Sequence, residues 1–449
     1  MKVRTRFAPS PTGYLHVGGL RTALYNYLYA KQNNGEFILR IEDTDQQRLI
    51  NNATENLIDI LITLNMQYDF GPNKEDEKGP YIQSLRLNIY KKYYMQLIKS
   101  QKAYVCFIKN DELYPEYDVD KALNKMVSHN YVVKFKVQQN KSIIIDDQIR
   151  GEITFDLSLI EDPIIIKSDG YPTYHFANVI DDHLMQITHV IRGEEWISSL
   201  PKHILLYQAY NWDLPQFYHL PLLLNPDKSK LSKRQGDVSV EDFLKHGYTK
   251  EALINFVALL GWHPNNDEEL FSLDELINTF SINRINKSGA IFDKEKLNWM
   301  NKEYIKNISL SDFQKIIENI LAKQKLSNSK INIDLIIPYA QNRVIQLTKI
   351  WDEIQCFYIY NKTETKELKK YNYQNLFLFW IEKLQMLKKI NEDKINSLIT
   401  DTKENLNISG KDFFIPMRIG LIDKIHGPDL FTIINILGIN ECINRLKQH

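Results

Sequence analysis

The chain has 449 residues, of which 43% are hydrophobic and 25% charged, and its 56 Lys+Arg balance its 56 Asp+Glu. This length predicts two or more domains, each large enough for its own core. No run of about 18 apolar residues occurs and the first residues are charged, which argues against a membrane span and a secretion signal and predicts a cytoplasmic protein.

Charge and cysteine content say little more about partners. Residues 301–449 hold 22 Lys+Arg against 17 Asp+Glu, which permits a polyanion there but also fits an ordinary solvated surface. The three cysteines, Cys106, Cys356 and Cys442, lie far apart without C-x-x-C spacing. A disulfide framework and a cysteine zinc site are therefore both unsupported.

The first predicted unit is a strand, a loop and a helix. Residues 3–7 alternate as in a strand, and apolar residues recur at helical spacing over 20–28. Between them, Pro9–Gly13 stops the strand, and Gly18–Gly19 leaves bare amides at the helix start, where an anion is favoured. His16 can donate a ring N–H to phosphate oxygens. The glycines match neither the dinucleotide nor the Walker pattern, so taken alone the loop is either a nucleotide site or a plain turn.

A second strand is predicted at Phe37–Ile41, which makes a parallel strand–helix–strand unit. Ligands gather at the carboxyl ends of such strands, where Arg6 and Glu42 both lie. Glu42, Asp43 and Asp45 invite a magnesium interpretation. Because the spacing of these carboxylates matches no dedicated cage, we expect Asp43 and Asp45 to cap the following turn and helix.

From about residue 103 the pattern changes to short β-rich pieces, among them Tyr131–Val137 and Ile143–Ile145. This change predicts a domain inserted between two halves of a nucleotide-binding fold. The doubly wound fold is expected to resume at Ile164–Lys167, with a further strand at Ile187–Ile191.

Two polar clusters follow. Asp181, Asp182 and His183 could be metal ligands, but adjacent residues on one element point apart, so capping of a helix end is favoured. Lys228–Gly236 is a lysine-rich loop, which is usually solvated surface. After residue 246 the sequence becomes helical and predicts an all-α bundle.

Several of these stretches resemble the motifs of one family. Pro9–Gly13 with His16–Gly19 resembles the first signature of class I aminoacyl-tRNA synthetases, and Lys230–Arg234 resembles the second, Lys-Met-Ser-Lys-Ser. Pro80–Arg86 and Phe292–Asn301 are similar to stretches typical of the glutamyl branch. The chain therefore resembles a bacterial-type glutamyl-tRNA synthetase over essentially its whole length.

The resemblance implies an α/β fold with a doubly wound parallel, Rossmann-like catalytic domain, split by an insertion and followed by helices. The expected parts are the first catalytic half (1–102), an inserted α+β acceptor-stem-binding domain (103–162), the second catalytic half with the lysine loop (163–245), a helical stem-contact domain (246–310) and a helical anticodon-binding domain (311–449).

The family reaction activates glutamate with ATP to glutamyl adenylate and pyrophosphate, then transfers the glutamyl group to the 3′-terminal adenosine of tRNA. The carboxylate attacks the α-phosphorus in line, so the enzyme chiefly positions reactants and neutralises charge on the leaving pyrophosphate. Mg²⁺ on the triphosphate is implied, and no zinc is expected. The residues that match the ATP-binding positions are His16, Gly18, Gly19, Glu195, Trp196, Leu224, Lys230 and Lys233, with His16, Lys230 and Lys233 catalytic.

Selecting glutamate over glutamine requires a cation, and a charge-assisted hydrogen bond contributes about 1.5 to 3 kcal/mol. Arg6 and Arg192 match the family's glutamate readers, although a structural ion pair with Glu42 would also account for Arg6. Likewise, Trp196 could simply be core. The other positions that match amino-acid contacts are Ala8, Ser10, Glu42, Tyr174 and Asn178.

The expected partners are L-glutamate and tRNA(Glu), and the expected state is a monomer away from membranes. An enzyme that also charges tRNA(Gln) is an alternative, because Gln341, with Asn342 and Arg343, falls near where the family reads the third anticodon base. A non-catalytic tRNA-binding paralogue is another, although the intact signature residues weigh against it. A truncated relative that glutamylates a tRNA base lacks such a C-terminal third.

Overall fold

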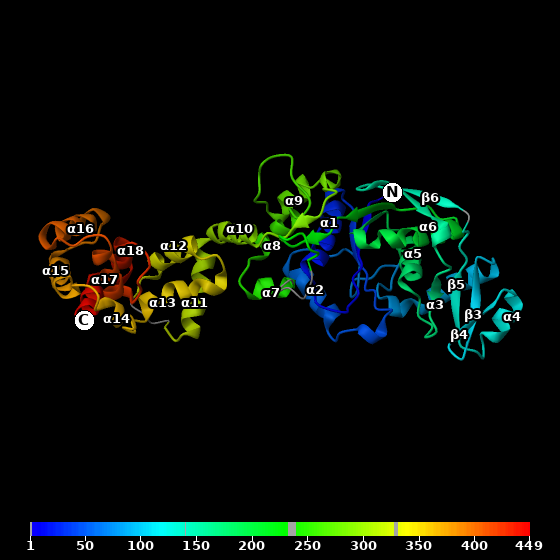
Figure 1. Ribbon diagram of the computed structural model, residues 1–449, viewed down its shortest axis with the longest axis horizontal. Coiled ribbons are helices and arrows are strands. Elements are labelled where there is room, and N and C mark those ends of the chain that lie inside the picture. The colour runs from blue at the N-terminus through cyan, green and yellow to red at the C-terminus, as the bar shows by residue number, and fades with distance from the viewer. Residues whose placement is uncertain (1, 140, 232–238, 327–330) are drawn as a thin grey trace. The chain divides into compact units, whose positions relative to one another are not determined.

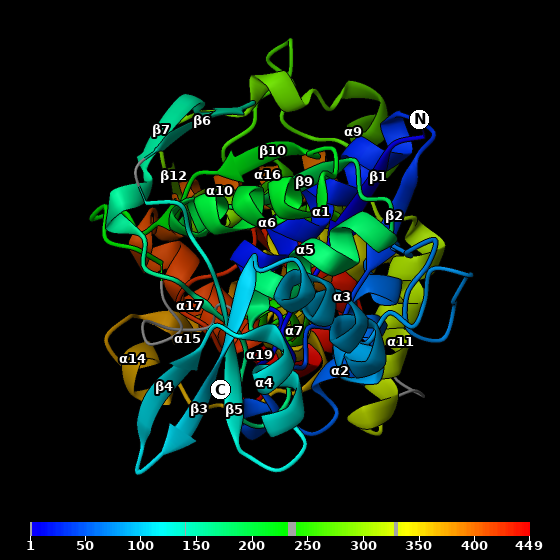
Figure 2. The same ribbon diagram turned by 90° about the vertical axis from the view of Figure 1, so that its right-hand side faces the viewer.

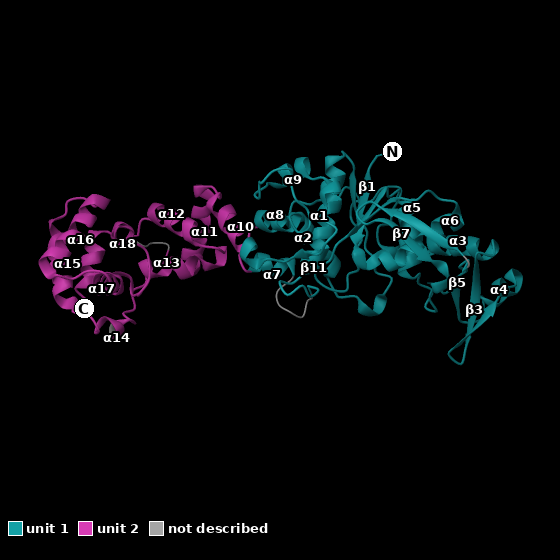
Figure 3. Cartoon of the chain, turned by 45° about the horizontal axis from the view of Figure 1, so that its top comes forward, with its two compact units in different colours: residues 1–245, 250–297 teal, residues 246–249, 298–449 magenta. Residues whose placement is uncertain are grey.

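The structure is a computed structural model that describes residues 2–139, 141–231, 239–326 and 331–449. Figure 3 shows its two compact units: unit 1 is residues 1–245 and 250–297, and unit 2 is residues 246–249 and 298–449. Lys233, predicted to be catalytic, lies outside the described residues. Within the described ranges, the helices are all too short or too polar to cross a bilayer.

A six-stranded sheet forms the centre of unit 1, in the order β2-β1-β9-β10-β6-β7 (Figures 1 and 2). All neighbouring strands run parallel except the β6–β7 pair. Every residue of β1 is buried, as expected for a parallel strand with both faces covered. The strands are β1 (Arg4–Phe7), β2 (Glu36–Leu39), β6 (Ser142–Asp147), β7 (Gly151–Asp156), β9 (His189–Gly193) and β10 (Gln216–Leu220).

Helices connect these strands and pack around them, and the predicted strand–loop–helix–strand start of the chain is confirmed. The helix α1 joins β1 to β2, which pair parallel with Thr5 opposite Phe37. The helices of unit 1 are α1 (Val17–Gln32), α2 (Ala53–Thr63), α3 (Leu87–Lys99), α4 (Val119–Lys125), α5 (Tyr174–Leu184), α6 (Leu200–Tyr210), α7 (Val240–Lys245), α8 (Lys250–Ala258) and α9 (Leu273–Thr279).

A second, four-stranded antiparallel sheet contains β3 (Ala103–Lys109), β4 (Glu112–Glu116), β5 (Tyr131–Phe135) and β8 (Ile164–Ile166), in the order β4-β3-β5-β8. This is the predicted inserted sheet, and Figure 2 shows β3, β4 and β5 beside α4, apart from the large sheet. Its core is shared with α3, α5 and α6, through residues such as Tyr90, Val133 and Phe176.

Two strand assignments differ from expectation. The strand β8, where the parallel fold was expected to resume, pairs antiparallel with β5 of the small sheet. The hairpin β6–β7, expected in the insertion, joins the large sheet because β6 pairs parallel with β10. An apolar run of three to six residues predicts a strand but not which sheet it joins, since that depends on distant partners. The domain boundaries themselves stay a prediction.

The predicted all-α C-terminal region is confirmed. The chain leaves the small two-stranded sheet of β11 (Leu223–Leu224) and β12 (Ala290–Ile291) and enters α10 (Lys294–Lys306). A single apolar core that includes Phe313, Trp380 and Ile434 holds the helices of unit 2 together. They are α11 (Leu310–Lys323), α12 (Ile333–Arg343), α13 (Ile350–Tyr358), α14 (Thr365–Leu368), α15 (Tyr373–Met386), α16 (Glu392–Leu406), α17 (Lys411–Ile422), α18 (Leu430–Leu437) and α19 (Ile439–Leu446).

Gln341 on α12 points into this core and is only 5% exposed. Its Nε2 donates to the carbonyl oxygens of Ile305 (3.0 Å), Lys306 (3.1 Å) and Ile308 (2.7 Å). Carbonyls at the end of a helix have no partner within the helix, so the Gln341 amide satisfies the end of α10. The Gln341 amide is therefore engaged with the end of α10, and an anticodon-reading role of this part of α12 stays a prediction.

We expect the change Gln341→Glu to destabilise unit 2 by about 1 to 3 kcal/mol, because it sets carboxylate oxygens against three carbonyl oxygens. The measurement is amide hydrogen exchange of α10 and α12 in the full chain. Asn342→Asp is the matched control, since it makes the same amide-to-acid change at an exposed neighbour. Equal loss of protection in both variants would contradict the capping role.

Candidate active site

A cavity of about 560 Å³ opens at the carboxyl ends of β1 and β9. Ligand sites of parallel sheets are expected at this edge. The cavity brings together residues from the predicted histidine loop, the predicted lysine loop and the predicted glutamate readers. The predicted site residues that line it are Arg6, Ala8, Ser10, His16, Gly18, Gly19, Glu42, Tyr174, Asn178, Arg192, Glu195, Trp196 and Lys230.

Both described ends of the lysine loop are tied to this cavity. Before the loop, Lys230 forms an antiparallel bridge with Leu224, and the N–H of Leu231 donates to the carbonyl of Leu223 (2.9 Å). After it, Ser239 forms an antiparallel bridge with His16. The two signature loops, far apart in the sequence, therefore meet at one wall. Ser232, Lys233 and Arg234 of the loop lie outside the described residues.

His16 begins α1 as its N-cap. Its Nδ1 accepts the N–H of Gly19 (3.1 Å), so in the neutral ring the proton is on Nε2. The ring packs against Gly18, where a Cβ would lie 3.1 Å from the Cε1 and Nδ1 atoms of His16. Two glycine N–H groups were expected to face the phosphates. In this structure the N–H of Gly19 is engaged by the His16 ring, and the N–H of Gly18 is the other member of the pair.

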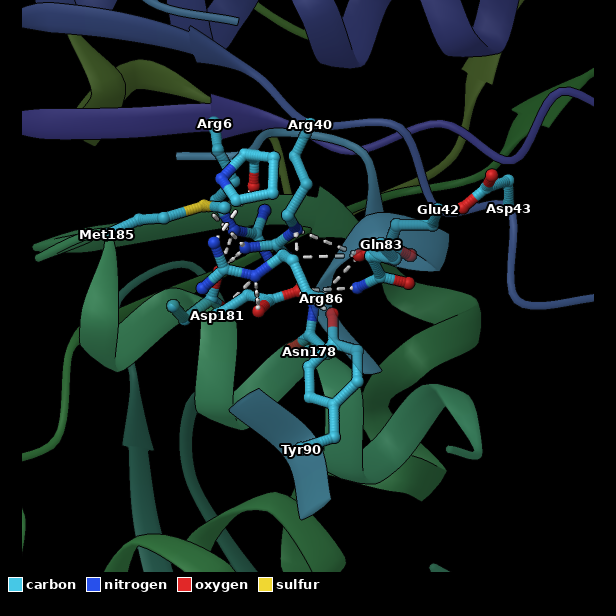
Figure 4. A network of polar contacts seen from close by, with 12 residues as sticks. Arg6, Arg40, Glu42, Asp43, Gln83, Arg86, Tyr90, Asn178, Asp181 and Met185 are labelled. Atoms are coloured by element: carbon cyan, nitrogen blue, oxygen red, sulfur yellow. Dashed lines mark hydrogen bonds and ion pairs between the residues drawn. The ribbon is translucent and has the colours of Figure 1, made fainter. Parts of the chain in front are cut away.

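A buried charge network lies at the ends of β1, β2 and α5 (Figure 4). Arg6 donates through Nε to Oδ1 of Asp182 (3.1 Å), and Arg40 donates through Nη1 to the same oxygen (2.7 Å). Arg40 also donates through Nη2 to Oε1 of Glu42 (3.0 Å). The buried partner of Arg6 is therefore Asp182, whereas the expected alternative was Glu42.

The expected helix-capping role of Asp181 and Asp182 is wrong. Asp181 accepts from Arg86 Nε (2.7 Å), Gln83 Nε2 (2.8 Å) and Tyr90 Oη (2.8 Å). The two carboxylates do point apart, as adjacent residues on a helix must. Arg40 forms ion pairs with both, at 2.7 Å from Asp182 Oδ1 and 4.0 Å from Asp181 Oδ2, and the remaining donors differ. Sequence spacing could not identify these partners, because they lie far away along the chain.

The network shifts two pKa values in opposite directions. Burial raises the pKa of Glu42 above its usual value, although the Arg40 guanidinium opposes the shift. Burial also disfavours charge on Asp182, but the Arg6 and Arg40 guanidiniums outweigh it and lower the pKa of that carboxyl. Asp182 is thus the fixed anion of the network, and Glu42 is the carboxylate that would gain most from another cation.

Arg192 at the end of β9 is held differently, because all its described partners are neutral acceptors. Its Nε donates to His219 Nε2 (3.0 Å), and its Nη1 donates to Tyr174 Oη (3.2 Å) and His203 Nδ1 (3.2 Å). Its Nη2 is buried and has no hydrogen-bond partner among the described residues. Arg192 lines the cavity, and a buried guanidinium whose Nη2 has no acceptor among the described residues suits a ligand carboxylate.

The predicted adenosine positions are partly brought to the cavity. Trp196 is half-buried on its wall, with its ring tilted by 34° against that of Tyr174 and the centroids 4.2 Å apart, and Glu195 is exposed. Leu224 does not line the cavity, and its carbonyl accepts the N–H of Phe292 (2.8 Å), whereas its neighbour Leu223 does line it. The predicted contact of the Leu224 backbone with adenosine stays a prediction.

The carboxylates that invited a magnesium interpretation have partners in the protein. Asp43 accepts the N–H of Ser84 (2.8 Å) at the start of a 3₁₀ helix, and Asp45 pairs with Arg48 (2.6 Å). The N-cap of α2 is Asn52, so neither aspartate caps that helix. Asp45 is at the N-cap of the 3₁₀ turn Gln46–Arg48, as expected for the turn, but its side chain makes no capping hydrogen bond there. Across the described ranges, His, Cys, Asp and Glu side chains form no group of three that could hold a metal ion.

Comparison with known proteins agrees with this geometry. Residues 2–299 match the family model of tRNA synthetases class I (E and Q), catalytic domain, and residues 294–449 match an anticodon binding domain. A glutamate–tRNA ligase of Clostridioides difficile (strain 630) is 39% identical over 99% of this chain and 98% of its own length. That of Chloroherpeton thalassium is 40% identical over 99% and 97%.

Solved structures give the same result. The crystal structure of a glutamate tRNA ligase from Elizabethkingia meningosepticum, in complex with its amino acid, has a TM-score of 0.90 to this chain at 34% identity. The match covers 100% of this chain and 99% of that one. A glutamate-tRNA synthetase from Elizabethkingia anophelis gives a TM-score of 0.87 at 35% identity, over the same shares.

We expect Asp182→Asn to destabilise the sheet edge by about 3 to 5 kcal/mol, because it leaves Arg6 and Arg40 buried without their shared anion. Hydrogen exchange of β1 and α5 amides in the full chain measures this. The control is Arg48→Ala, which breaks an exposed ion pair and should cost less than about 1 kcal/mol. A loss in Asp182→Asn no larger than in the control would refute the structural role of the network.

Proposed function

The chain belongs to the glutamate–tRNA ligases, a branch of the class I aminoacyl-tRNA synthetases, and we propose that the cavity at the ends of β1 and β9 is where it activates glutamate with ATP. The observation that carries the proposal is that His16 and Lys230, one from each signature loop, line the same cavity as Arg192, whose buried Nη2 has no acceptor among the described residues.

On the ATP side, the proposed roles are positioning and charge neutralisation. His16 donates its Nε2–H to a phosphate oxygen, and the Gly18 amide at the start of α1 adds the positive end of the helix dipole. Lys230 and Lys233 supply the cations that stabilise the departing pyrophosphate. Glu195, Trp196 and the backbone near Leu224 hold the adenosine.

On the glutamate side, Arg192 binds the side-chain carboxylate through its Nη2, with Arg6 as the second guanidinium. Glu42 binds the substrate ammonium, which would lower the burial-raised pKa of its carboxyl again. Glutamate and glutamine have nearly the same shape, but the side-chain amide of glutamine is neutral and cannot form an ion pair with Arg192. The charge of Arg192 therefore discriminates between the two amino acids. Ala8, Ser10, Tyr174 and Asn178 complete this side.

The substrate carboxylate then attacks the α-phosphorus, and glutamyl adenylate and pyrophosphate form. In the second step the 3′-terminal adenosine of tRNA(Glu) accepts the glutamyl group. Mg²⁺ enters with the triphosphate, where phosphate oxygens and water are its usual ligands. The match of residues 294–449 to an anticodon binding domain supports tRNA as the acceptor. A cytoplasmic location and a monomeric state belong to the same proposal.

We expect glutamate-dependent exchange between ATP and pyrophosphate when cognate tRNA is present. Arg192→Gln keeps the hydrogen-bonding shape but removes the charge, so kcat/KM for glutamate should fall about 10- to 150-fold while KM for ATP changes little. Lys230→Gln should instead impair the use of ATP and leave KM for glutamate little changed. Arg48→Gln, the same change at an exposed site, is the control. If the unchanged protein shows no glutamate-dependent exchange between ATP and pyrophosphate, the proposed function is wrong.

The identity of the second tRNA is a separate question. Since Gln341 is buried, no described feature of α12 supports relaxed anticodon reading, and we expect tRNA(Glu) to be charged in preference to tRNA(Gln). Charging both purified tRNAs with labelled glutamate measures the ratio. Comparable charging of the two would establish the alternative of a non-discriminating enzyme.

A further inference from the structure

Behind Arg192, two buried side chains from neighbouring strands form a chain of hydrogen bonds. Arg192 on β9 lies directly opposite His219 on β10, and β6 supplies Asp147 on the far side of β10. His219 and Asp147 are fully buried, and Arg192 is 4% exposed. Neither His219 nor Asp147 lines the cavity.

The hydrogen bonds fix which nitrogen of His219 carries the proton. Asp147 Oδ2 lies 2.6 Å from His219 Nδ1, and the carboxylate can only accept, so Nδ1 is the protonated nitrogen. His219 Nε2 then presents its lone pair to the Nε–H of Arg192 at 3.0 Å. Burial lowers the pKa of His219, although the Asp147 hydrogen bond opposes this, so the ring is neutral at pH 7. One tautomer of a neutral ring thus satisfies both neighbours.

Asp147 is itself locked in place by the turn between β6 and β7. Its Oδ1 accepts the N–H groups of Ile149 (3.1 Å) and Arg150 (2.8 Å). Arg150 forms an ion pair with Glu194, next to the end of β9, and donates through Nη1 to the carbonyl of Lys287 (2.6 Å). The hairpin turn therefore has little freedom to move its carboxylate away from His219.

The other edge of the guanidinium is held by a second histidine pair. Arg192 Nη1 donates to His203 Nδ1, so the proton of His203 is on Nε2, which faces His175 Nδ1 at 3.2 Å. With Nε and Nη1 both fixed, the plane of the guanidinium is set, and Nη2 is the nitrogen left for a ligand. The position of that nitrogen depends on acceptors that never touch the ligand.

We infer that Asp147 and His219 are positioning residues for substrate recognition: Asp147 selects the tautomer of His219, and His219 holds Arg192 so that its Nη2 meets the side-chain carboxylate of glutamate. This inference rests on the proposed role of Arg192 and extends it to residues that do not line the cavity. Residues of the neighbouring strands β10 and β6 thus set the orientation of Arg192, and this orientation determines the discrimination against glutamine.

Two substitutions of His219 separate its two contacts. An Asn side chain places its amide near the position of Nδ1, and a Gln side chain places its amide near that of Nε2. His219→Gln therefore keeps an acceptor for Arg192, whereas His219→Asn keeps only a donor for Asp147. In glutamate-dependent exchange with tRNA present, we expect KM for glutamate to rise about tenfold or more in His219→Asn and less than about threefold in His219→Gln, with KM for ATP little changed in both.

Asp147→Asn provides an independent variant of nearly the same size. If its amide NH₂ faces the ring, His219 Nδ1 must accept, the proton moves to Nε2, and two donors oppose each other at Arg192. If it faces the turn, the N–H groups of Ile149 and Arg150 lose their acceptor. The first orientation should raise KM for glutamate and weaken discrimination against glutamine, whereas the second keeps the tautomer of His219 and disturbs only the turn. The inference is therefore testable even if one His219 variant fails to fold.

The readouts distinguish this inference from the proposed function. Equal effects of the Asn and Gln changes at His219, or parallel rises in KM for glutamate and ATP, would mean that His219 is merely structural and would overturn the inference. The same holds if Arg192→Gln impairs glutamate use while the His219 and Asp147 variants behave like the unchanged protein. Loss of exchange in the unchanged protein would overturn the proposed function first.

Discussion

The organising constraint of unit 1 is the cost of burying guanidinium groups at one edge of a parallel sheet. Arg6 ends β1, Arg40 follows β2 and Arg192 ends β9, and all three are nearly inaccessible to solvent. A buried charge is tolerated only when it is neutralised or fully hydrogen-bonded. Asp182 neutralises Arg6 and Arg40, whereas Arg192 is surrounded by neutral acceptors and keeps one N–H group without a partner among the described residues.

Because of this difference, Arg6 and Arg40 have a mainly structural role and Arg192 is the arginine suited to bind a ligand. The pairing with Asp182 makes Arg6 and Arg40 part of a rigid wall that joins β1, β2 and α5. Arg192 retains the positive charge that a carboxylate ligand would meet, and neutral histidines hold its orientation without cancelling that charge. The same edge carries the start of α1 and both described ends of the lysine loop, so a nucleotide and an acidic amino acid would be brought together there.

Local signals predicted the parts of the site that are themselves local. The loop that ends in His16 could be recognised because prolines, glycines and the helix pattern lie within twenty residues of one another, and β1, α1 and β2 followed from it. The roles of Asp181 and Asp182 could not, because their partners Arg86 and Arg6 lie elsewhere in the sequence. For the same reason the sequence did not indicate the hydrogen bonds of His219 and Asp147 behind Arg192. Asp147 lies in a hairpin that was predicted to belong to the insertion but joins the large sheet.

The central claim is that Arg192 supplies the main cation for the substrate carboxylate, with Arg6, which Asp182 neutralises, as the second guanidinium. Nitrogen-15 NMR of arginine side chains in the full chain, with signals assigned from Arg192→Lys and Arg6→Lys variants, tests it most directly. We predict that glutamate shifts the Arg192 guanidinium resonances strongly and those of Arg6 less, and that glutamine leaves Arg192 nearly unchanged. A response confined to Arg6, or the same response of Arg192 to both amino acids, would contradict this account.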